Sequence, residues 1–318
     1  MSQEPFRYFT ESQVHALLVA EPADYVQSLR SAVRSIARGK SHLVLPPKQL
    51  FTDARNRGDF RVMPCEVRRG SSITKTVKVI GTNTRQRAVP DQITVGKLLV
   101  LDPRENFISA IMEACLLSSA RTGACAALAI DALARSRNEM VVIGGGRVGT
   151  YAALYAIAAA NVKRVVFCDV VAQRARQAAS WVAGRFSEVP CEARALASIE
   201  SADVVVLATT STRPIGRIAG WGANLVVSLG ADTDTQSELD TAWPKRADLY
   251  CDTFDSLRFG DLRAWIEAGL TKRAAISDLL DIYRSPPAAT RRPRVFISTG
   301  SALFDNLTAR YLLEAGAT

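Results

Sequence analysis

Histidine is scarce in this chain, which has only His15 and His42 among its 318 residues. Serine-histidine-aspartate triads and most zinc or iron sites depend on imidazole, so this shortage argues against both kinds of site. The candidates for a catalytic acid or base are therefore lysine, tyrosine, or a carboxylate assisted by arginine. We expect no bound metal.

Paired cysteines and long apolar runs are also absent. The six cysteines include no C-x-x-C pair, which argues against a zinc cluster or a disulfide framework and favours reduced core thiols. The longest weakly charged stretch, residues 148–162, is shorter than the roughly 20 apolar residues that a membrane-spanning helix needs. The opening residues lack the apolar run of a secretory signal. We expect a cytoplasmic protein with no membrane partner.

Positive charge is in excess, with a formal net charge of +9. Aromatic and basic residues do not interleave as a single-strand-binding platform requires, and no recognition-helix motif occurs, so nucleic acid is not the expected partner. Small anionic ligands account for the excess as well, because a positive surface steers them toward a site. A chain of this length suggests about two domains.

The first third of the sequence predicts helices followed by a sheet. Thr10 and Gln13 form a capping-box pair, which indicates a helix start. A second helix is predicted over residues 23–38, where apolar residues recur at helical spacing up to Gly39. The pattern then changes to the period of strands. The predicted strands span residues 60–67, 73–82 and 93–101, and a long alanine-rich helix spans residues 114–134.

From Met140 onward, short apolar strands alternate with helices. This order is typical of a doubly wound parallel sheet, and we predict a Rossmann-type α/β domain. The last apolar helix, through Leu313, has no strand after it, and we expect it to pack back on the first domain. The predicted strands lie at residues 141–143, 164–169, 204–208, 225–228, 249–251 and 294–298, and the predicted helices between them at 150–160 and 172–183.

A glycine-rich turn follows the first of these strands and opens a helix. It matches G-x-G-x-x-G, the fingerprint of a dinucleotide-binding turn. Gly144 permits the tight turn, Gly146 lets the backbone approach a pyrophosphate, and Gly149 lets the helix pack close to the strand. The N–H groups and the helix dipole would meet the phosphate charge. The predicted cofactor-binding residues of the turn are Gly144, Gly146, Arg147, Val148 and Gly149.

Polar residues follow two of the predicted strands. Asp169 stands where a carboxylate would accept hydrogen bonds from a ribose 2′-hydroxyl, and it would repel a 2′-phosphate, so NAD(H) is favoured. Arg174 nearby keeps NADP(H) open as the alternative. Thr209, Thr210 and Ser211 stand at the carboxyl edge, where they would line the cofactor. An ordinary polar strand exit explains these three hydroxyls equally well.

Five further motifs are spread along the chain. They are Asp59-Phe60-Arg61-Val62-Met63-Pro64, Val77-Lys78-Val79, Ser119-Ala120-Arg121-Thr122-Gly123-Ala124, Leu229-Gly230-Ala231-Asp232 with Glu238-Leu239, and Ser298-Thr299-Gly300-Ser301-Ala302. Together with the glycine turn, in this order and spacing, they resemble the ornithine cyclodeaminase and mu-crystallin family. The resemblance implies a substrate-binding and dimerisation domain over residues 1–125, completed by residues 296–318, a Rossmann domain over residues 126–295, and a homodimer.

The resemblance assigns roles that the residue chemistry supports. Lys78 would reach the substrate carboxylate and amine and assist catalysis, although a strand lysine usually only faces water. Arg121 lies in an apolar helix segment, where a bound carboxylate would satisfy its guanidinium, with an internal salt bridge as the alternative. Asp232 would exchange a proton with a substrate amine or with water, and it could also cap a helix. Lys48 matches an early substrate-binding position and Gly300 a cofactor-binding one.

Two departures from the family pattern bear on the substrate. Arg61 stands where ornithine cyclodeaminases carry a carboxylate that holds a distal amine, so its opposite sign argues against a diamine. Asp234-Thr235-Gln236 stands where the family often has Pro-Gly-Lys. The sequence most resembles the archaeal alanine dehydrogenase and the amino-carboxyethyl-glutamate dehydrogenase branches.

The sequence therefore predicts an NAD-dependent oxidoreductase that acts on the Cα–N bond of an amino or imino acid. Lys48, Arg61, Lys78 and Arg121 would form a cationic cradle, which would also suit a second substrate carboxylate. Two alternatives stay open. An NAD-dependent cyclodeaminase of ornithine or lysine type would release ammonia without net NAD consumption. A mu-crystallin-like protein would bind a nicotinamide cofactor and a small molecule without turnover, although it would not need a proton-transfer acid.

Overall fold

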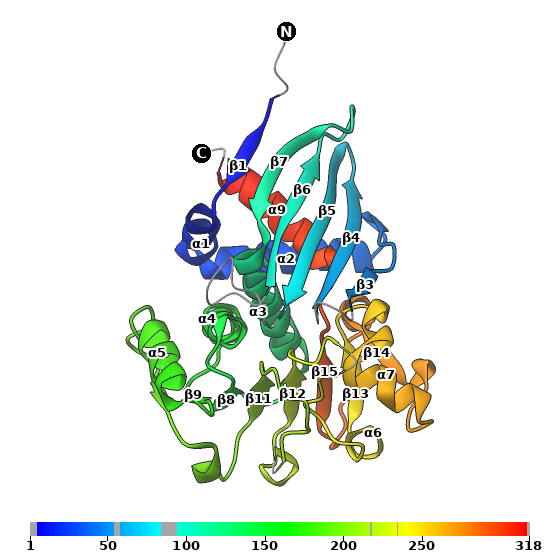
Figure 1. Cartoon of the computed structure of the whole chain (residues 1–318). Helices are drawn as coiled ribbons and strands as arrows, with labels where there is room; N and C mark the ends of the chain where they lie inside the picture. Colours follow the sequence, from blue (N-terminus) through cyan, green and yellow to red (C-terminus); the bar gives the residue numbers. More distant parts are fainter. Residues whose placement is uncertain (1–4, 54–57, 84–93, 217, 234, 317–318) are drawn as a thin grey trace. The chain divides into compact units, whose positions relative to one another are not determined.

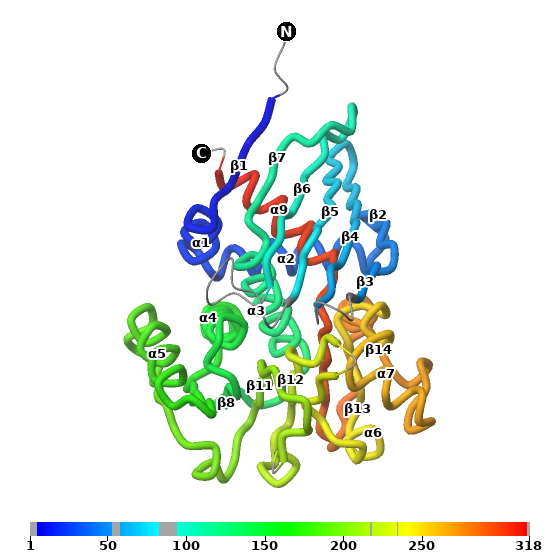
Figure 2. Tube along the Cα trace, in the orientation of Figure 1, coloured from blue at the N-terminus to red at the C-terminus, as the bar shows by residue number. Residues whose placement is uncertain are grey.

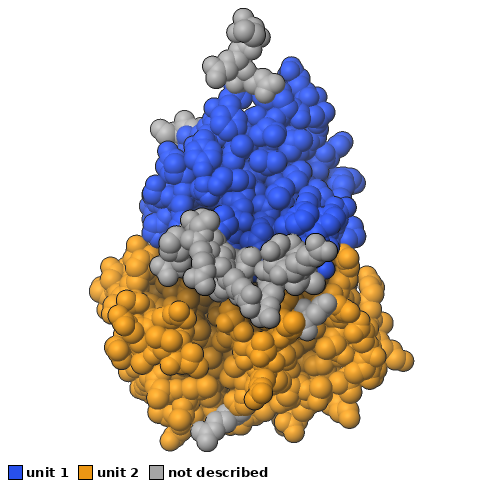
Figure 3. All heavy atoms as spheres, viewed as in Figure 1, with its two compact units in different colours: residues 1–121, 301–318 blue, residues 122–300 orange. Residues whose placement is uncertain are grey.

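A computed structural model of the chain describes residues 5–53, 58–83, 94–216, 218–233 and 235–316. The chain divides into two compact units, coloured separately in Figure 3: Met1–Arg121 with Ser301–Thr318, and Thr122–Gly300. The first crossing lies within helix α3 (Ala114–Leu133), and the second lies directly before helix α9 (Ala302–Ala315). The predicted domain boundaries, 125/126 and 295/296, lie a few residues from these crossings.

Unit 1 is built on a seven-stranded sheet of order β1-β7-β6-β5-β4-β2, with β3 also paired to β4. Strands β1 and β7 are parallel, and the other pairs are antiparallel. Strands β4, β5 and β6 are the three predicted ones, and the rest are additional. The elements in Figure 1 are β1 (Arg7–Phe9), α1 (Glu11–Ala20), α2 (Pro22–Ala37), β2 (His42–Val44), β3 (Gln49–Asp53), β4 (Gly58–Arg69), β5 (Ser72–Asn83), β6 (Thr94–Leu101) and β7 (Ile108–Glu113).

The predicted signals of the first two helices are confirmed. Thr10 caps α1 by accepting a hydrogen bond from the Gln13 N–H at 3.3 Å, and the Gln13 side chain accepts one from the Thr10 N–H at 2.9 Å. Helix α2 buries one apolar face that includes Tyr25 and Leu29. Gly39 follows it with φ of +69°, a left-handed conformation that favours glycine.

One face of β4 and β5 is buried beneath α9. The odd-numbered residues of β4 from 61 to 67 and the even-numbered residues of β5 from 74 to 80 are buried, and the pairing of Met63 with Lys78 puts both sets on one face. The side-chain amide of Asn306 on α9 donates to the carbonyls of Cys65 at 3.2 Å and Thr74 at 2.9 Å. Figure 2 shows this red C-terminal segment beside the strands. The terminal helix therefore packs back on the first unit, as predicted.

Unit 2 contains a parallel eight-stranded sheet of order β10-β9-β8-β11-β12-β15-β13-β14. The strand order reverses between β8 and β11, and in open α/β sheets ligands bind at the carboxyl ends of the strands at such a reversal. The predicted Rossmann-type fold is confirmed. The strands are β8 (Met140–Ile143), β9 (Val165–Cys168), β10 (Cys191–Ala193), β11 (Val204–Leu207), β12 (Leu225–Ser228), β13 (Asp248–Cys251), β14 (Ile276–Asp278) and β15 (Arg294–Ile297).

Helices connect these strands. Helix α4 begins at Arg147, inside the predicted turn, because Gly146 is its N-cap. The α-helices of unit 2, besides its part of α3, are α4 (Arg147–Ala160), α5 (Ala172–Ala183), α6 (Trp243–Arg246), α7 (Gly260–Glu267) and α8 (Leu279–Arg284). Short 3₁₀ turns occur at Leu196–Ser198, Ile218–Gly220, Phe254–Arg258 and Arg273–Ala275.

Helix α3 is long and apolar enough to cross a membrane by length and composition alone. It lies outside residues 148–162, the stretch that the sequence analysis considered and found too short. However, 78% of its most apolar window is buried inside the protein. It also carries the buried charge of Arg121. A helix that is apolar on nearly all sides and surrounded by its own protein is typical of a globular core.

Arginines at the amino edge of the unit 2 sheet bind main-chain carbonyls. Because a guanidinium has five N–H donors in a fixed fork, one side chain can hold two segments of backbone together. This edge is opposite to the glycine turn, so these charges are structural and account for part of the basic excess. The acceptors, at 2.6–3.1 Å, are the carbonyls of Asp131 and Ala160 for Arg137, of Leu133 and Ala288 for Arg294, and of Lys245 and Ala247 for Arg292.

Candidate active site

The glycine turn lies at the strand-order reversal of unit 2. Gly144 has φ of +108°, and a Cβ there would lie 2.3 Å from the Ala208 carbonyl oxygen. A Cβ on Gly149 would lie 2.2 Å from the Gly144 oxygen, whereas one on Gly146 would meet nothing within 4 Å. Gly146 provides no side-chain cap to α4. The turn therefore has open space and a helix N-terminus where a pyrophosphate would bind, with Arg147 and Val148 in the first helical turn.

Asp169 follows β9 and its carboxylate faces the glycine turn. Its Oδ2 accepts a hydrogen bond from the Gly145 N–H and its Oδ1 one from the Val171 N–H, both at 2.8 Å. Each oxygen has a second lone pair that a ribose hydroxyl could use. The backbone of Arg174 packs behind Gly145, where a Cβ would lie 2.8 Å from the Arg174 carbonyl. These residues are near one another, as the fingerprint predicts.

Glu238 joins the ends of β11 and β12. Its Oε1 accepts hydrogen bonds from the N–H and the hydroxyl of Thr209, and its Oε2 accepts from Ser228 Oγ at 2.7 Å and the Gly230 N–H at 3.0 Å. Burial raises the pKa of Glu238 although these four donors lower it. The Thr209 hydroxyl is thus committed to the scaffold and also accepts from the Ser211 N–H at 3.2 Å, while Thr210 is exposed.

The loop after β12 carries Asp232, which is half-buried. A Cβ on Gly230 would lie 2.0 Å from the Thr209 carbonyl oxygen, so the strand ends are packed too closely for any other residue. In the orientation that satisfies its neighbours, the Gln236 amide donates to Asp232 Oδ1 at 3.0 Å and to Thr233 Oγ1 at 3.0 Å. The residue at the place of the family's lysine therefore contacts the candidate acid. Asp234, between them, lies outside the described residues.

The four cations of the predicted cradle are all buried in unit 1. Lys48 precedes β3, Arg61 lies on β4, Lys78 on β5 and Arg121 on α3, and each is at most 6% exposed. Arg61 and Lys78 share the sheet face beneath α9, and the charge of Lys48 acts on Lys78. The structure therefore brings residues from two strands, one helix and one loop to one region of this unit.

Arg61 pairs with a carboxylate that the sequence analysis did not weigh. Its Nε lies 3.0 Å and its Nη2 3.4 Å from the two oxygens of Asp59, two positions earlier on the same strand. Alternate residues of a strand point to the same face, so the pairing follows from the strand period. Asp59 offsets part of the positive charge at Arg61. The sign of this one position therefore argues less strongly against an amine than the sequence alone indicates.

Asp305 on α9 binds both Lys78 and Arg121. Its Oδ1 accepts a hydrogen bond from Arg121 Nε at 2.8 Å, and its Oδ2 lies 2.8 Å from Lys78 Nζ. The internal salt bridge that was the alternative for Arg121 is thus present. It does not use the whole guanidinium, because the buried Nη1 has no hydrogen-bond partner within the part of the chain that the structure describes. A carboxylate ligand would supply that partner.

Burial and charge perturb both ends of this pair. Burial lowers the pKa of Lys78 to about 7, with further lowering by Arg121 and Lys48, and Asp305 opposes the fall. Burial alone would raise the pKa of Asp305, but Arg121 and Lys78 hold it below its ordinary value. Perturbed groups of this kind, buried beside specific charged partners, are common in catalytic sites.

Asp305 is the residue that the sequence analysis missed. It stands in the apolar run Ala302 to Leu307, as Arg121 stands in the apolar part of α3. A lone charge in an apolar helix requires a partner. Asp305 could therefore have been predicted on the same ground as Arg121. The two residues, which lie 184 positions apart in the sequence, are each other's partners.

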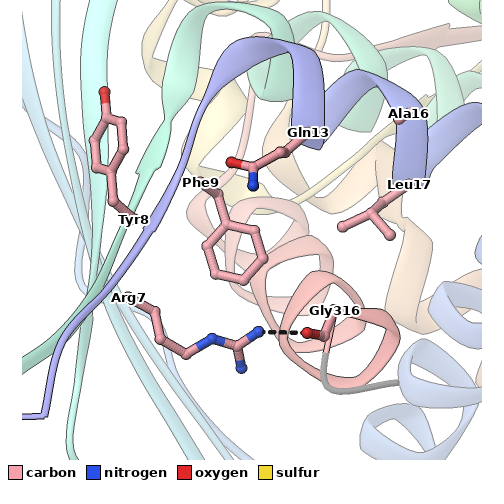
Figure 4. A pocket seen from close by; sticks show the side chains of 7 residues that line it. All are labelled: Arg7, Tyr8, Phe9, Gln13, Ala16, Leu17 and Gly316. Atoms are coloured by element: carbon pink, nitrogen blue, oxygen red, sulfur yellow. Dashed lines mark hydrogen bonds between the residues drawn. The ribbon is translucent and has the colours of Figure 1, made fainter.

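Gly300 and a pocket in unit 1 are not part of the groups described above. Gly300 has φ of +84° and follows Ser298, whose hydroxyl donates to the buried Asp252 at 2.6 Å. A pocket of about 460 Å³ in unit 1, shown in Figure 4, lies between β1, α1 and the end of α9. Arg7 crosses it and donates to the Gly316 carbonyl at 2.7 Å. None of the predicted site residues line this pocket, so it is not the candidate active site.

The sequence matches the model of the ornithine cyclodeaminase/mu-crystallin family over residues 8–316. The chain belongs to this family. The resemblance inferred from the motifs is confirmed over nearly the whole length. The alanine dehydrogenase of Archaeoglobus fulgidus is 27% identical to this chain, and the alignment covers 96% of this chain and 93% of the relative. The L-lysine cyclodeaminase of Streptomyces rapamycinicus is 30% identical over 84% of this chain and 79% of its own.

Solved structures of the family share the fold. A Δ1-pyrroline-2-carboxylate reductase of Thermococcus litoralis, in complex with NADH and L-proline, has a TM-score of 0.85 at 21% identity, covering 98% of this chain and 97% of its own. An archaeal alanine dehydrogenase dimer with bound NAD has a TM-score of 0.83 at 20% identity, covering 98% and 96%. At this identity the likeness shows the architecture of both units.

Proposed function

We propose that this protein is an NAD-dependent oxidoreductase that acts on the Cα–N bond of an amino or imino acid. The observation that carries the proposal is the buried pair of Lys78 and Arg121, which has an N–H at Arg121 Nη1 without a partner among the described residues. Burying such a donor costs about 1–3 kcal/mol unless a ligand accepts from it. The family's dehydrogenases and reductases act on substrates of this class.

The cofactor end of the proposal rests on unit 2. Gly144 has the positive φ of the tight turn, Gly146 borders open space, and Gly149 lets the helix pack closely against the turn. Asp169 would accept from the ribose and disfavour a 2′-phosphate. NADP(H) remains the alternative through Arg174. The nicotinamide group would supply or accept the hydride. The protein's part is to hold the substrate still and to move the proton.

The substrate end rests on unit 1. Lys78 and Arg121 would bind the α-carboxylate, which fixes the orientation of Cα, and Lys48 and Arg61 would extend the cradle toward a second carboxylate. Ionic contacts of this kind lower the barrier by positioning. Asp232 would give a proton to the imine nitrogen during reduction, or accept one from the amine or from attacking water in the oxidative direction.

A direct assay tests this proposal. The protein is mixed with NADH and either Δ1-pyrroline-2-carboxylate or pyruvate with ammonia, and with NAD and a panel of amino acids, while absorbance of the reduced nicotinamide is followed. Net consumption or formation of NADH with one of these substrates supports the proposal. Cofactor binding without any turnover would overturn it in favour of a binding protein like mu-crystallin.

The cyclodeaminase reading is the second candidate, and the pairing of Arg61 with Asp59 favours keeping it. Asp59 provides a carboxylate on the substrate-facing side of β4 that a distal amine could approach. Ornithine and lysine are therefore assayed with NAD for released ammonia. Ammonia without accumulation of NADH would identify a cyclodeaminase, and ammonia with equal NADH would identify a dehydrogenase.

We also propose a homodimer in the cytoplasm. The sheet of unit 1 has a second face, away from α9, on which Tyr8, Phe51, Phe60 and Val79 are 39–47% exposed, and the rings of Phe51 and Phe60 stack at 4.5 Å. A related alanine dehydrogenase is a dimer. Six free cysteines suit a reducing compartment. Light scattering should give twice the chain mass, and Phe60→Glu should give the monomer mass. A monomeric parent protein would overturn the dimer.

A further inference from the structure

Asp305 divides its two oxygens between two cations. Oδ1 faces Arg121 Nε and Oδ2 faces Lys78 Nζ, each at 2.8 Å, and the carboxylate is fully buried. Lys78 and Arg121 come from a strand and a helix that are not adjacent in sequence. A single carboxylate shared in this way fixes the distance between two positive charges that would otherwise repel each other.

The position of Asp305 is itself fixed by its neighbours on α9. Asn306 donates to the Cys65 and Thr74 carbonyls and to Thr76 Oγ1 at 3.1 Å, which anchors the helix to β4 and β5. Thr308 shares a 2.6 Å hydrogen bond with the Tyr25 hydroxyl of α2. The helix therefore cannot slide along the strands without breaking buried hydrogen bonds.

The arrangement leaves hydrogen-bond donors for a ligand. Lys78 has three N–H groups. Its Nζ forms the ion pair with Asp305 Oδ2 and donates to the hydroxyl of Ser118, one helical turn before Arg121, at 3.2 Å. Arg121 uses Nε for Asp305, and its buried Nη1 has no partner among the described residues. A carboxylate has two oxygens and can accept from both cations together.

We propose that Asp305 is a positioning residue of this site. It holds the Lys78 ammonium and the Arg121 guanidinium side by side, opposes the loss of the Lys78 proton inside the core, and leaves N–H donors of both side chains for the substrate carboxylate. This inference rests on the proposed function and assigns Asp305 a role in it without contact to substrate. While Lys78 is protonated, these two cations and Asp305 carry one net positive charge, which matches one carboxylate.

A loss of packing would affect Lys78 differently from a loss of charge. The charged groups that act on Lys78 are Asp305, Arg121 and Lys48, and the charge of Asp305 also acts on Cys65 and Tyr25. Removing the negative charge of Asp305 leaves Lys78 beside two cations, so its pKa should fall by about one to three units. Removing the charge of Arg121 takes away a cation that lowers the pKa of Lys78, while Asp305 still raises it, so the pKa of Lys78 should rise. A loss of packing alone would not move the two variants in opposite directions.

The experiment follows the Lys78 side chain by NMR. The full chain is labelled with ¹³Cε-lysine, the Lys78 signal is assigned by its loss in Lys78→Met, and its titration is recorded in the parent protein, Asp305→Asn and Arg121→Gln. Thr308→Val, which removes a buried hydrogen bond from the same helix, is the matched control and should leave the titration unchanged. A fall in Asp305→Asn and a rise in Arg121→Gln support the proposal.

Three results would overturn it: an unchanged titration in Asp305→Asn, shifts of the same sign in both variants, or a shift in Thr308→Val as large as in Asp305→Asn. If Asp305→Asn does not fold, Arg121→Gln decides alone, and the absence of a rise overturns the proposal.

A final arm adds acetate as a minimal carboxylate. In the parent protein acetate should raise the pKa of Lys78, and in Arg121→Gln the rise should be smaller. No rise in the parent protein overturns the assignment of the remaining donors to a carboxylate. None of these measurements uses turnover, so an enzyme assay that fails with every substrate would refute the proposed function while the Lys78 titration still tests Asp305.

Discussion

Oε1 of Glu238 accepts both the N–H and the hydroxyl of Thr209, each at 2.8 Å. The other oxygen holds Ser228 and Gly230 at the end of the neighbouring strand. The N–H groups of Glu238 and Leu239 are themselves held by the buried Asp261 at 3.0 and 3.1 Å. Two carboxylates thus hold the strand ends from which the loop of Asp232 extends, although neither was predicted as a site residue.

Replacing Glu238 by Gln should loosen this edge. The amide nitrogen cannot accept a hydrogen bond, so two of the four buried donors lose their partner, and we expect a loss of about 1–3 kcal/mol in the free energy of unfolding. Urea denaturation measures this, and NADH affinity should weaken as well. Glu267→Gln is the control, since Glu267 is exposed beside Arg263 and should contribute at most about 1 kcal/mol. Equal midpoints for the two variants would contradict the prediction.

Asp169→Asn should reduce the preference for NADH over NADPH. The variant removes the charge that would repel a 2′-phosphate, and we expect the ratio of the two dissociation constants to change by about tenfold or more, which is about 1.4 kcal/mol. Fluorescence titration with each cofactor gives the ratio. Asp203→Asn changes a carboxylate at the amino edge, which accepts from Ser136 Oγ at 2.6 Å, and should leave the ratio alone. An unaltered ratio in Asp169→Asn would show that another residue selects the cofactor.

Asp232→Asn should keep NADH binding and lose turnover. An amide cannot exchange the proton, and general acid–base catalysis contributes about 10²–10⁴-fold to a rate. The kcat with the substrate that the direct assay identifies and the dissociation constant of NADH are measured in parallel. Asp240→Asn, an exposed aspartate whose Oδ1 accepts from the Ala242 N–H at 2.8 Å, is the control. A variant that retains the parent kcat would remove Asp232 from the proposed mechanism.

Lys78 should make stability depend on pH. Its pKa is 10.5 in the ordinary state and about 7 in the folded chain, so between these values the unfolded chain holds a proton that the folded chain has released. Stability then rises with pH by about 1.4 kcal/mol per unit, and below pH 7 the contribution is constant.

The measurement is the free energy of unfolding of the parent protein minus that of Lys78→Met, taken in urea at pH 6, 7.5 and 9. The difference should grow in favour of the parent protein above neutral pH. Lys75→Met, three positions earlier on β5, controls for the loss of a lysine from this strand. A difference that stays flat from pH 6 to 9 would mean that Lys78 keeps its proton in the fold.

The sequence predicts the elements that carry a clear hydrophobic period. Buried residues alternate with others from 61 to 67 in β4 and from 74 to 80 in β5. Strands β8, β9, β11 and β12 are continuous apolar runs, as strands buried on both faces are. Strands β1, β2, β10 and β14 have three residues each, which is too short to show a period. They form because a longer neighbour offers unpaired backbone groups, and a local pattern does not contain that information.

The candidate site shows the same division. Period and motif place Lys78 and Arg121 in buried positions, but their shared partner Asp305 comes from the other end of the chain. The prediction for Arg121 offered a salt bridge or a ligand, and the structure shows the bridge at Nε while Nη1 stays without a partner among the described residues. The pairing of Asp59 with Arg61 could have been predicted, because residues two apart on a strand point to the same face.

The arginines at the amino edge of unit 2 have a practical consequence for protein engineering. Three of them donate hydrogen bonds to backbone carbonyls, namely Arg137, Arg292 and Arg294. A guanidinium is a donor only and stays protonated at any ordinary pH. Exchanging these arginines for glutamate, whether to reduce adhesion to polyanions or to aid purification, would remove these hydrogen bonds, and Arg294→Glu would break the one between the start of β15 and the end of α3. Charge variants of this protein should therefore alter arginines elsewhere.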